Sequence, residues 1–334
     1  MNDINFFSKN KYILLPTKNN PKVALSIDNF SITKNAFKLY NPFSPKAKFF
    51  KRVVMFFYLY FNLLGSMFAT KKAKSQFVEY LETLLGQHLV VSIYYATIND
   101  KVVLQLQSLD AKVIGYLKYP LNEIGLKHIN NEIEAYELFS SLKIVEPYIL
   151  AESYNNVPFL LLKELNGEIG LVEKNYLNIV LEKLKRENTY RLADHPRILE
   201  MQKVLLENKM LEHQTKVEKI VANSKGEYKL VYEHGDFTPW NFVKVEENYI
   251  PFDFEYFVEN GLEYFDIIKY YYQVGKLLEF KVDEELVSFI SDNVNIQEIK
   301  ELLELFLIKE ILSGKEEGEP IEFEINMIKV LAKI

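Results

Sequence analysis

Cysteine is absent from this chain of 334 residues. Its absence excludes disulfides, thiolate metal sites, iron–sulfur clusters and a cysteine nucleophile, and it fits a reducing cytoplasm. Only five histidines are present, so the chemistry of a site must come mainly from carboxylates, lysines and hydroxyls. No secretory signal is expected, because the first apolar stretch runs into Lys18-Asn19-Asn20-Pro21 and not into a small-residue cleavage site. We therefore expect a cytoplasmic protein whose core, drawn from 49% hydrophobic residues, forms without covalent links.

Charge is spread unevenly along the chain. Residues 1–75 hold 13 Lys and Arg against two acids, Asp3 and Asp28, although the whole chain carries a formal net charge of −6. Such a basic segment indicates an anionic partner: a membrane surface, a phosphorylated substrate, nucleic acid or the acidic remainder of the chain itself. We expect no nucleic-acid partner.

The first 85 residues are expected to form a basic N-terminal extension. Four prolines and several Asn and Lys residues predict irregular, turn-rich structure over 1–45. From Lys46 to about Leu85 the pattern favours helix, and 53–69 form its apolar centre.

This apolar centre, residues 53–69, has three possible environments. Its 17 residues fall short of the roughly 20 that span a bilayer, and they include polar Asn62 and Ser66. The surrounding cations over residues 46–74 suit a helix lying at the inner face of a membrane, with its charges among the headgroups. The third alternative is a helix that packs on the rest of the domain.

Strand patterns begin after this helix. Runs rich in β-branched and aromatic residues occupy 89–95, 101–107 and 112–118, with turns at Asn99-Asp100 and Asp110. A helix is expected at 130–142, and two more strands flank Asn155-Asn156. Beyond Gly167 the chain is predicted to be mainly helical, with short β segments over 228–256.

Acidic and amide residues lie close together in the sequence, near two of these short β segments. Asp236 is followed five residues later by Asn241, and Asp253 and Glu255 come at the end of the next apolar run. Phosphoryl transfer needs a carboxylate that accepts the proton of the attacking hydroxyl, and hard oxygen ligands that hold Mg²⁺. Asp236 therefore suits the base, and Asn241, Asp253 and Glu255 suit the metal; the alternative is that these acids are solvated turn residues.

The stretch His234-Gly235-Asp236-Phe237-Thr238-Pro239-Trp240-Asn241, with Asp253-Phe254-Glu255, resembles the catalytic and metal motifs of the aminoglycoside phosphotransferase and choline kinase family. The resemblance covers roughly residues 85–280. It implies an α+β, two-lobed, protein-kinase-like fold with a small antiparallel sheet in the N-lobe and a mainly helical C-lobe. It also implies that Asp236 is the catalytic base and that Asn241 and Asp253 bind magnesium, while His234 and Trp240 support the loop.

The same resemblance implies further assignments along the chain. The extension would cover 1–85, the N-lobe 86–166 and the C-lobe 167–334. Lys118 at the end of the third strand would pair with Glu132, for which Glu134 and Glu137 compete, and hold the phosphates of ATP. The adenine contacts would fall at Lys163, Glu164 and Leu165, and Asp266 would support the catalytic loop from behind.

The expected function is transfer of the γ-phosphoryl group of ATP, with Mg²⁺, to a hydroxyl of a small molecule. Residues 40–48 are similar to the leader of uncharacterised bacterial phosphotransferase-like proteins, which implies a sugar or glycan precursor as acceptor, beside amino alcohols and aminoglycosides. One departure from the family is the first hairpin turn, Tyr95 to Asp100, which has no glycine to close over the phosphates. That departure favours an alternative, a pseudokinase-like nucleotide-binding or scaffold protein that docks on a membrane or partner through its basic helix. A protein kinase or a nucleotidyl-transferring relative is a third hypothesis.

Overall fold

The computed structural model describes residues 4–17, 19–39, 45–60, 69–95 and 100–334. They divide into two compact units, which are treated separately below. The first unit comprises the described residues up to Ile133 together with Pro147–Leu165. The second unit comprises Glu134–Glu146 and Asn166–Ile334.

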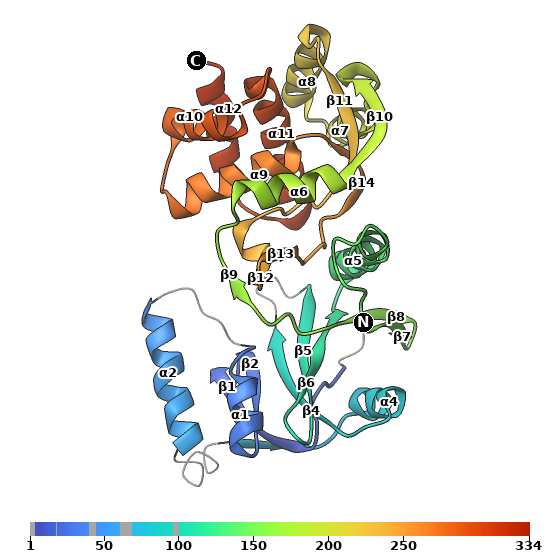
Figure 1. Cartoon of the computed structure of the whole chain (residues 1–334), viewed down its shortest axis with the longest axis vertical. Coiled ribbons are helices and arrows are strands. Elements are labelled where there is room, and N and C mark those ends of the chain that lie inside the picture. Colours follow the sequence, from blue (N-terminus) through green and yellow to red (C-terminus); the bar gives the residue numbers. More distant parts are fainter. Residues whose placement is uncertain (1–3, 18, 40–44, 61–68, 96–99) are drawn as a thin grey trace. The chain divides into compact units, whose positions relative to one another are not determined.

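An antiparallel sheet is the centre of the first unit, and in the described part of the chain it has eight strands in the order β3-β1-β2-β4-β5-β6-β8-β7. Its elements, drawn in Figure 1, are β1 (Asn10–Pro16), β2 (Pro21–Ile27), α1 (Phe30–Ala36), α2 (Pro45–Tyr60), β3 (Thr70–Lys72), α4 (Gln76–Leu85), β4 (Leu89–Tyr95), β5 (Lys101–Ser108), β6 (Val113–Pro120), α5 (Glu123–Ser141), β7 (Leu150–Tyr154) and β8 (Val157–Leu162). The strands expected at 89–118 and around Asn155-Asn156 are confirmed. The helix expected at 130–142 is α5, which begins earlier, where Asn122 Oδ1 accepts a hydrogen bond from the backbone N–H of Gly125.

The prediction of irregular structure over residues 1–45 is wrong for Asn10–Pro16, Pro21–Ile27 and Phe30–Ala36. β1 and β2 form a hairpin there, and β2 pairs with β4, so that the N-terminal segment extends the sheet. Pro16 ends β1 and Pro21 begins β2, so both prolines lie beside the turn, where a missing N–H removes little from the ladder. Two of the four prolines that suggested irregular structure are therefore the ends of strands, and α1 follows them. Pro45 begins α2, and Pro42 lies outside the described residues.

The single helical run predicted from Lys46 to Leu85 is also interrupted, because β3 lies between α2 and α4. Residues 61–68 of the apolar centre lie outside the described residues. Tyr58 of α2 is buried, and Val54 and Met55 pack with it against core residues of β1 and β2. One face of α2 therefore packs on the first unit. Among the described residues, no helix combines the length and hydropathy needed to cross a bilayer.

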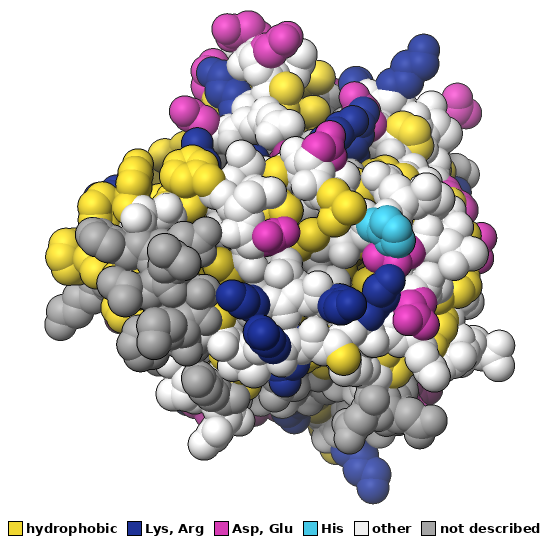
Figure 2. All heavy atoms as spheres, turned by 90° about the horizontal axis from the view of Figure 1, so that it is seen from below, with side chains coloured by type: hydrophobic (Ala, Val, Ile, Leu, Met, Phe, Trp, Pro, Cys, Tyr) yellow, Lys and Arg dark blue, Asp and Glu magenta, His cyan; other side chains and the backbone are white. Residues whose placement is uncertain are grey.

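The opposite face of α2 is exposed. We call it the aromatic face of α2, and it consists of Phe49, Phe50, Val53, Phe56 and Tyr60, each between 49% and 69% exposed. In Figure 2, where the first unit is seen end-on, hydrophobic side chains gather at the left, the side on which Figure 1 draws α2.

The second unit is mainly helical, as predicted beyond Gly167. After the end of α5 its elements are β9 (Glu168–Ile169), α6 (Lys174–Leu184), β10 (Lys185–Arg191), η1 (Leu192–Asp194), α7 (Pro196–Glu207), α8 (Leu211–Asn223), β11 (Glu227–Glu233), η2 (Pro239–Asn241), β12 (Phe242–Val245), β13 (Asn248–Pro251), β14 (Val258–Leu262), α9 (Phe265–Gln273), the π-helical turn η3 (Val274–Leu278), α10 (Asp283–Val294), α11 (Ile299–Glu317) and α12 (Glu322–Leu331). The short β segments expected over 228–256 are present as β11, β12 and β13.

Two small antiparallel sheets, β10-β11-β14 and β13-β12-β9, hold the loops of the second unit. Strand β10 carries the sequence Lys-Arg-Glu-Asn-Thr-Tyr-Arg, which lacks an apolar alternation, and it had not been predicted. Helix α11 runs through the interior, where Leu302, Phe306 and Ile308 are fully buried. It is drawn beside α9, α10 and α12 in Figure 1, in agreement with their packing contacts.

Candidate active site

The catalytic-loop candidate begins where β11 ends. Gly235 has a φ of 82°, a left-handed conformation that glycine adopts without strain. A Cβ at this position would lie 2.0 Å from the carbonyl oxygen of Tyr256, so a glycine is also needed for space. The backbone N–H groups of His234 and Gly235 donate to the two carboxylate oxygens of Asp266, at 2.8 and 3.0 Å.

Asp266, at the start of α9, thus holds the loop through its backbone. This is the position expected of a residue that supports the loop from behind. Burial and the neighbouring Glu233 carboxylate raise the pKa of Asp266 to about 7, while the two N–H donors and Lys309 oppose that rise. The loop therefore rests on a buried acid whose protonation state depends on the charges around it.

Asn241 fixes the side chain of Asp236. Its amide nitrogen donates to the backbone oxygen of Asp236 at 2.9 Å and to Oδ2 of the same residue at 2.8 Å. Because both contacts use the amide nitrogen, Oδ1 of Asn241 is left as an acceptor for a cation. The step of five residues between Asp and Asn is thus a direct contact in the structure.

The hairpin β12–β13 brings the second motif to the first. Phe242 pairs with Pro251, and the backbone N–H of Phe252 donates to the carbonyl oxygen of Asn241 at 3.0 Å. Asp253, the next residue, has a φ of 66°, which is uncommon outside glycine and is often found at functional sites. Residues 236–241 and 252–255 are therefore adjacent, as the sequence motifs predicted.

Aromatic side chains fix both motifs in place. Phe254 is fully buried, and its ring lies 4.8 Å from those of Phe139 and His234, and 5.0 Å from that of Tyr136. Burial lowers the pKa of His234, although the nearby carboxylates of Asp236 and Asp253 oppose this. A neutral, buried imidazole supports the loop, which is the role expected for His234.

In the first unit, Lys118 and Glu132 form the predicted pair. Nζ of Lys118 lies 2.7 Å from Oε1 of Glu132, and both side chains are buried. The competing residues Glu134 and Glu137 are exposed on α5. The choice among three glutamates is therefore settled in favour of Glu132, while its role toward a nucleotide stays a prediction.

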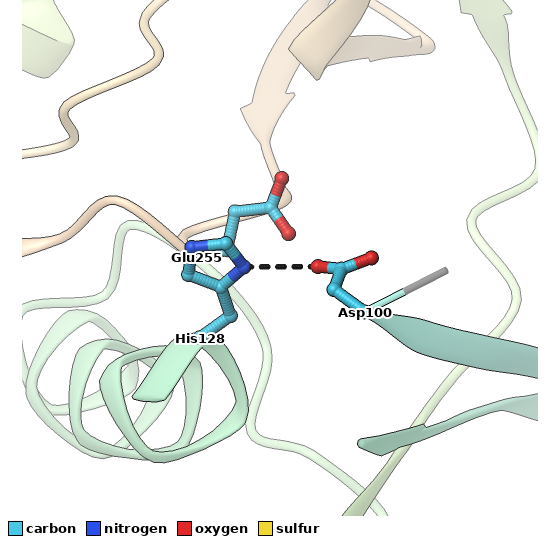
Figure 3. Close-up of side chains that lie close together, drawn as sticks. All are labelled: Asp100, His128 and Glu255. Carbon is cyan, nitrogen blue, oxygen red and sulfur yellow. Dashed lines mark hydrogen bonds and ion pairs between the residues drawn. The ribbon is translucent and has the colours of Figure 1, made fainter. Parts of the chain in front are cut away.

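The end of the first hairpin carries a contact that the sequence did not indicate. Nδ1 of His128, on α5, lies 3.1 Å from Oδ2 of Asp100, and both side chains are buried (Figure 3). This contact ties the start of β5 to α5. The glycine-free turn itself, residues 96–99, lies outside the described residues.

The proposed adenine-contact segment follows β8. Lys163 is exposed, and Oε1 of Glu164 lies 3.1 Å from Nζ of Lys38. One of the three points at which the chain passes from one unit to the other falls after Leu165, at the end of this segment. Its role as an adenine-contacting linker stays a prediction. Lys38 comes from the basic N-terminal segment, and its pairing with Glu164 was not foreseen.

In the second unit a series of ion pairs, in which cations and acids alternate, begins at Asp236. Nζ of Lys269 lies 3.5 Å from Oδ1 of Asp236 and 2.5 Å from Oε2 of Glu310. Lys309 in turn contacts Glu310 at 3.1 Å and Glu233 at 3.3 Å, and Arg197 contacts Glu233 at 3.5 Å. We call these six residues the charge row. None of its cations was singled out from the sequence.

No family model matches the sequence, and no curated protein does so either. Solved structures do match. A thermostable mutant of aminoglycoside phosphotransferase APH(4)-Ia, in a complex with ADP and hygromycin B, superposes with a TM-score of 0.51 at 8% identity, covering 77% of this chain and 96% of that one. This chain has a protein-kinase-like fold.

Two other solved structures match with lower TM-scores. Ethanolamine kinase from Plasmodium vivax matches with a TM-score of 0.43 at 12% identity, over 91% of this chain and 94% of that chain. The macrolide 2′-phosphotransferase MphH from Brachybacterium faecium, an apoenzyme, matches with a TM-score of 0.48 at 14% identity, over 76% and 96% of the two chains. The match to the aminoglycoside phosphotransferase confirms the predicted fold class, α+β and kinase-like.

Proposed function

We propose that the chain is an ATP- and Mg²⁺-dependent phosphotransferase that acts on a hydroxyl group of a small molecule. The observation that carries the proposal is the contact set of Asp236 and Asn241, joined through the β12–β13 hairpin to Asp253. In this proposal the first unit contains the N-terminal extension and most of the N-lobe, while the second unit contains the C-lobe and residues 134–146, the end of α5 and the segment after it.

In the proposed reaction an oxygen of the acceptor hydroxyl bonds to the γ-phosphorus, and the bond from that phosphorus to the β–γ bridging oxygen breaks. ADP leaves with the electron pair, and the proton of the hydroxyl passes to the carboxylate of Asp236. The donor set fits a hard cation, because Asn241 keeps an amide oxygen and Asp253 and Glu255 add carboxylates. When bound there, Mg²⁺ would neutralise phosphate charge. Lys118 and Glu132 would orient the phosphates, and Lys163, Glu164 and Leu165 would contact adenine.

The acceptor classes are a sugar, a glycan precursor, an amino alcohol and an aminoglycoside. The second lobe of this fold carries specificity on its helices and loops, here residues 171–225 and the C-terminal helices, and the fold alone does not determine it. The aminoglycoside phosphotransferase with the same fold was solved with hygromycin B, so aminoglycosides belong in a first screen.

Thermal shift with Mg-ATP tests the nucleotide site. A ligand that binds the folded state stabilises it in proportion to RT ln(1 + [L]/Kd), so the melting temperature of the wild type should rise with Mg-ATP. Asp253→Ala should abolish the rise, while Asp292→Ala, an exposed acid on α10, should keep it. With the acceptor found, Asp236→Ala should lose turnover; wild-type turnover in that variant would contradict the mechanism.

The rival function is a pseudokinase-like nucleotide-binding or scaffold protein. Mg-ATP binding without phosphoryl transfer to any member of a broad acceptor panel, and without phosphate release, would favour it. Transfer of AMP in place of phosphate would instead favour a nucleotidyl transferase, and phosphorylation of a protein acceptor would favour a protein kinase.

A second proposal concerns peripheral contact with an anionic membrane through residues 46–74. It is supported by the aromatic face of α2 and by the charges on that helix, which include Lys48, Lys51 and Arg52 but no acid. Exposed aromatic residues beside cations suit the headgroup region of an anionic bilayer. A location at the cytoplasmic face of a membrane remains part of the same proposal.

Vesicle co-sedimentation tests this contact. The full chain should sediment with vesicles of phosphatidylcholine and phosphatidylglycerol, and less with phosphatidylcholine alone. Phe49→Ser with Phe56→Ser should release it, while Phe280→Ser, at a still more exposed aromatic of the second unit, should not. Vesicle binding that is unchanged by the double substitution, or dimers in its place, would contradict a lipid partner.

A further inference from the structure

The charge row ends at the proposed catalytic base. Its members come from α7, β11, α11, α9 and the catalytic loop, and their signs alternate in the order Arg197, Glu233, Lys309, Glu310, Lys269, Asp236. Glu233 is fully buried, and the side chains of Lys269 and Lys309 are 11% and 9% exposed. Buried charges are tolerated only when each has a partner of opposite sign, and here each member has at least one.

Lys269 links the proposed catalytic base to the rest of this row, because its ammonium group contacts two carboxylates. Glu310 Oε2 lies at 2.5 Å and Asp236 Oδ1 at 3.5 Å. The shorter contact fixes the ammonium group from behind, and Glu310 is itself fixed by Lys309 at 3.1 Å. Glu310 therefore fixes the ammonium group of Lys269 beside the carboxylate of Asp236.

The two oxygens of Asp236 have different partners. Asn241 donates to Oδ2 at 2.8 Å, and Lys269 faces Oδ1. A carboxylate held at both oxygens keeps one rotamer, and a hydroxyl can then approach a lone pair whose direction is set in advance. We propose that Lys269, held by Glu310, is a positioning residue that fixes the carboxylate of Asp236 for phosphoryl transfer. This proposal rests on the proposed function.

Phosphate release from Mg-ATP is the probe reaction, with water as the acceptor. Lys269→Met should lower kcat by about ten- to a hundredfold, with the Kd for Mg-ATP changed less than about twofold, since a lost transition-state contact lowers kcat and not ground-state binding. Lys269→Arg, which keeps a cation that can bridge two carboxylates, should restore most of kcat. Lys276→Met is the matched control, because Lys276 forms a 2.9 Å ion pair with Glu324 outside the charge row; it should leave kcat unchanged.

Three results would overturn the proposal: a kcat of Lys269→Met equal to that of Lys276→Met, a loss that appears only in the affinity for Mg-ATP, or a kcat of Lys269→Arg no higher than that of Lys269→Met.

A second measurement does not depend on turnover. The melting temperatures of Lys269→Met, Asp236→Asn and the double variant should be non-additive, with the double variant losing less than the two single losses together. Additive losses would show that the two side chains do not interact. If the wild type neither binds Mg-ATP nor releases phosphate, the proposed function itself is contradicted. The positioning role of Lys269 is then contradicted too, whatever the melting temperatures of the single and double variants show.

Discussion

Lys118 reaches Glu132 across the first unit, from the sheet to α5, with 2.7 Å between Nζ and Oε1. Glu132 is fully buried, so removal of the ammonium group leaves its carboxylate without this cation in a low-dielectric site. The pair therefore links α5 to strand β6. The binding of any group to the ammonium of Lys118 will depend on the positions of both elements.

Lys118→Met should weaken Mg-ATP binding by at least about tenfold, because the variant loses a charge assigned to the phosphates. It should also lower the free energy of unfolding by about 3 kcal/mol, the usual result of breaking a buried ion pair. Titration with a fluorescent ATP analogue and urea unfolding measure the two effects separately. Lys112→Met, at an exposed lysine near the start of β6, is the control and should change neither. Unchanged affinity in Lys118→Met would remove Lys118 from the nucleotide site.

Much of this arrangement is predictable from the sequence, for identifiable reasons. The strands β4, β5 and β6 are rich in apolar and β-branched residues, and β4 and β6 add aromatic ones. The pairing of Lys118 with Glu132 is what the resemblance to the phosphotransferase family implies. The hairpin β1–β2 escaped prediction because its prolines, which usually interrupt strands, lie at its turn. The contact of Lys269 with Glu310 joins two helices that are distant in sequence, and only tertiary packing decides which charges on their surfaces meet.

Gly235→Ala should disrupt the catalytic loop. The substitution meets two obstacles: a φ of 82° and a Cβ position 2.0 Å from the carbonyl oxygen of Tyr256. Strained backbone and overpacking each cost about 1–3 kcal/mol, so a loss of about 3 kcal/mol in unfolding free energy is expected. Gly170→Ala, where no atom lies within 4 Å of the added Cβ, should be close to neutral. Equal stability of the two variants in urea unfolding would show that the loop has another conformation.

Asp266→Asn should change how stability depends on pH. Burial and Glu233 raise the pKa of Asp266 to about 7 from 3.8, so its contribution is fully present below about pH 4 and is lost as the pH rises toward 7. An asparagine does not titrate, and its amide nitrogen would face one of the two N–H donors, at a cost of about 2 kcal/mol. Urea unfolding from pH 4 to pH 7 should therefore give a flatter profile for the variant than for the wild type. Parallel profiles would show that Asp266 does not titrate in this range.

Glu310→Gln should show the opposite dependence. Burial alone would raise the pKa of Glu310, but the ammonium groups of Lys269 and Lys309 outweigh it and lower the pKa to about 2. A lowered pKa in the folded state means that the stabilisation is present above about pH 4.5 and is lost as the pH falls toward 2. The variant should thus be less stable than the wild type by about 3 kcal/mol at neutral pH, and the difference should shrink on acidification. Glu301→Gln, on the exposed side of the same helix, supplies the comparison and should follow the wild type at every pH. If Glu310→Gln also followed the wild type at every pH, the charge row would hold no net stabilisation, and Lys269 would lack the support that fixes it beside Asp236.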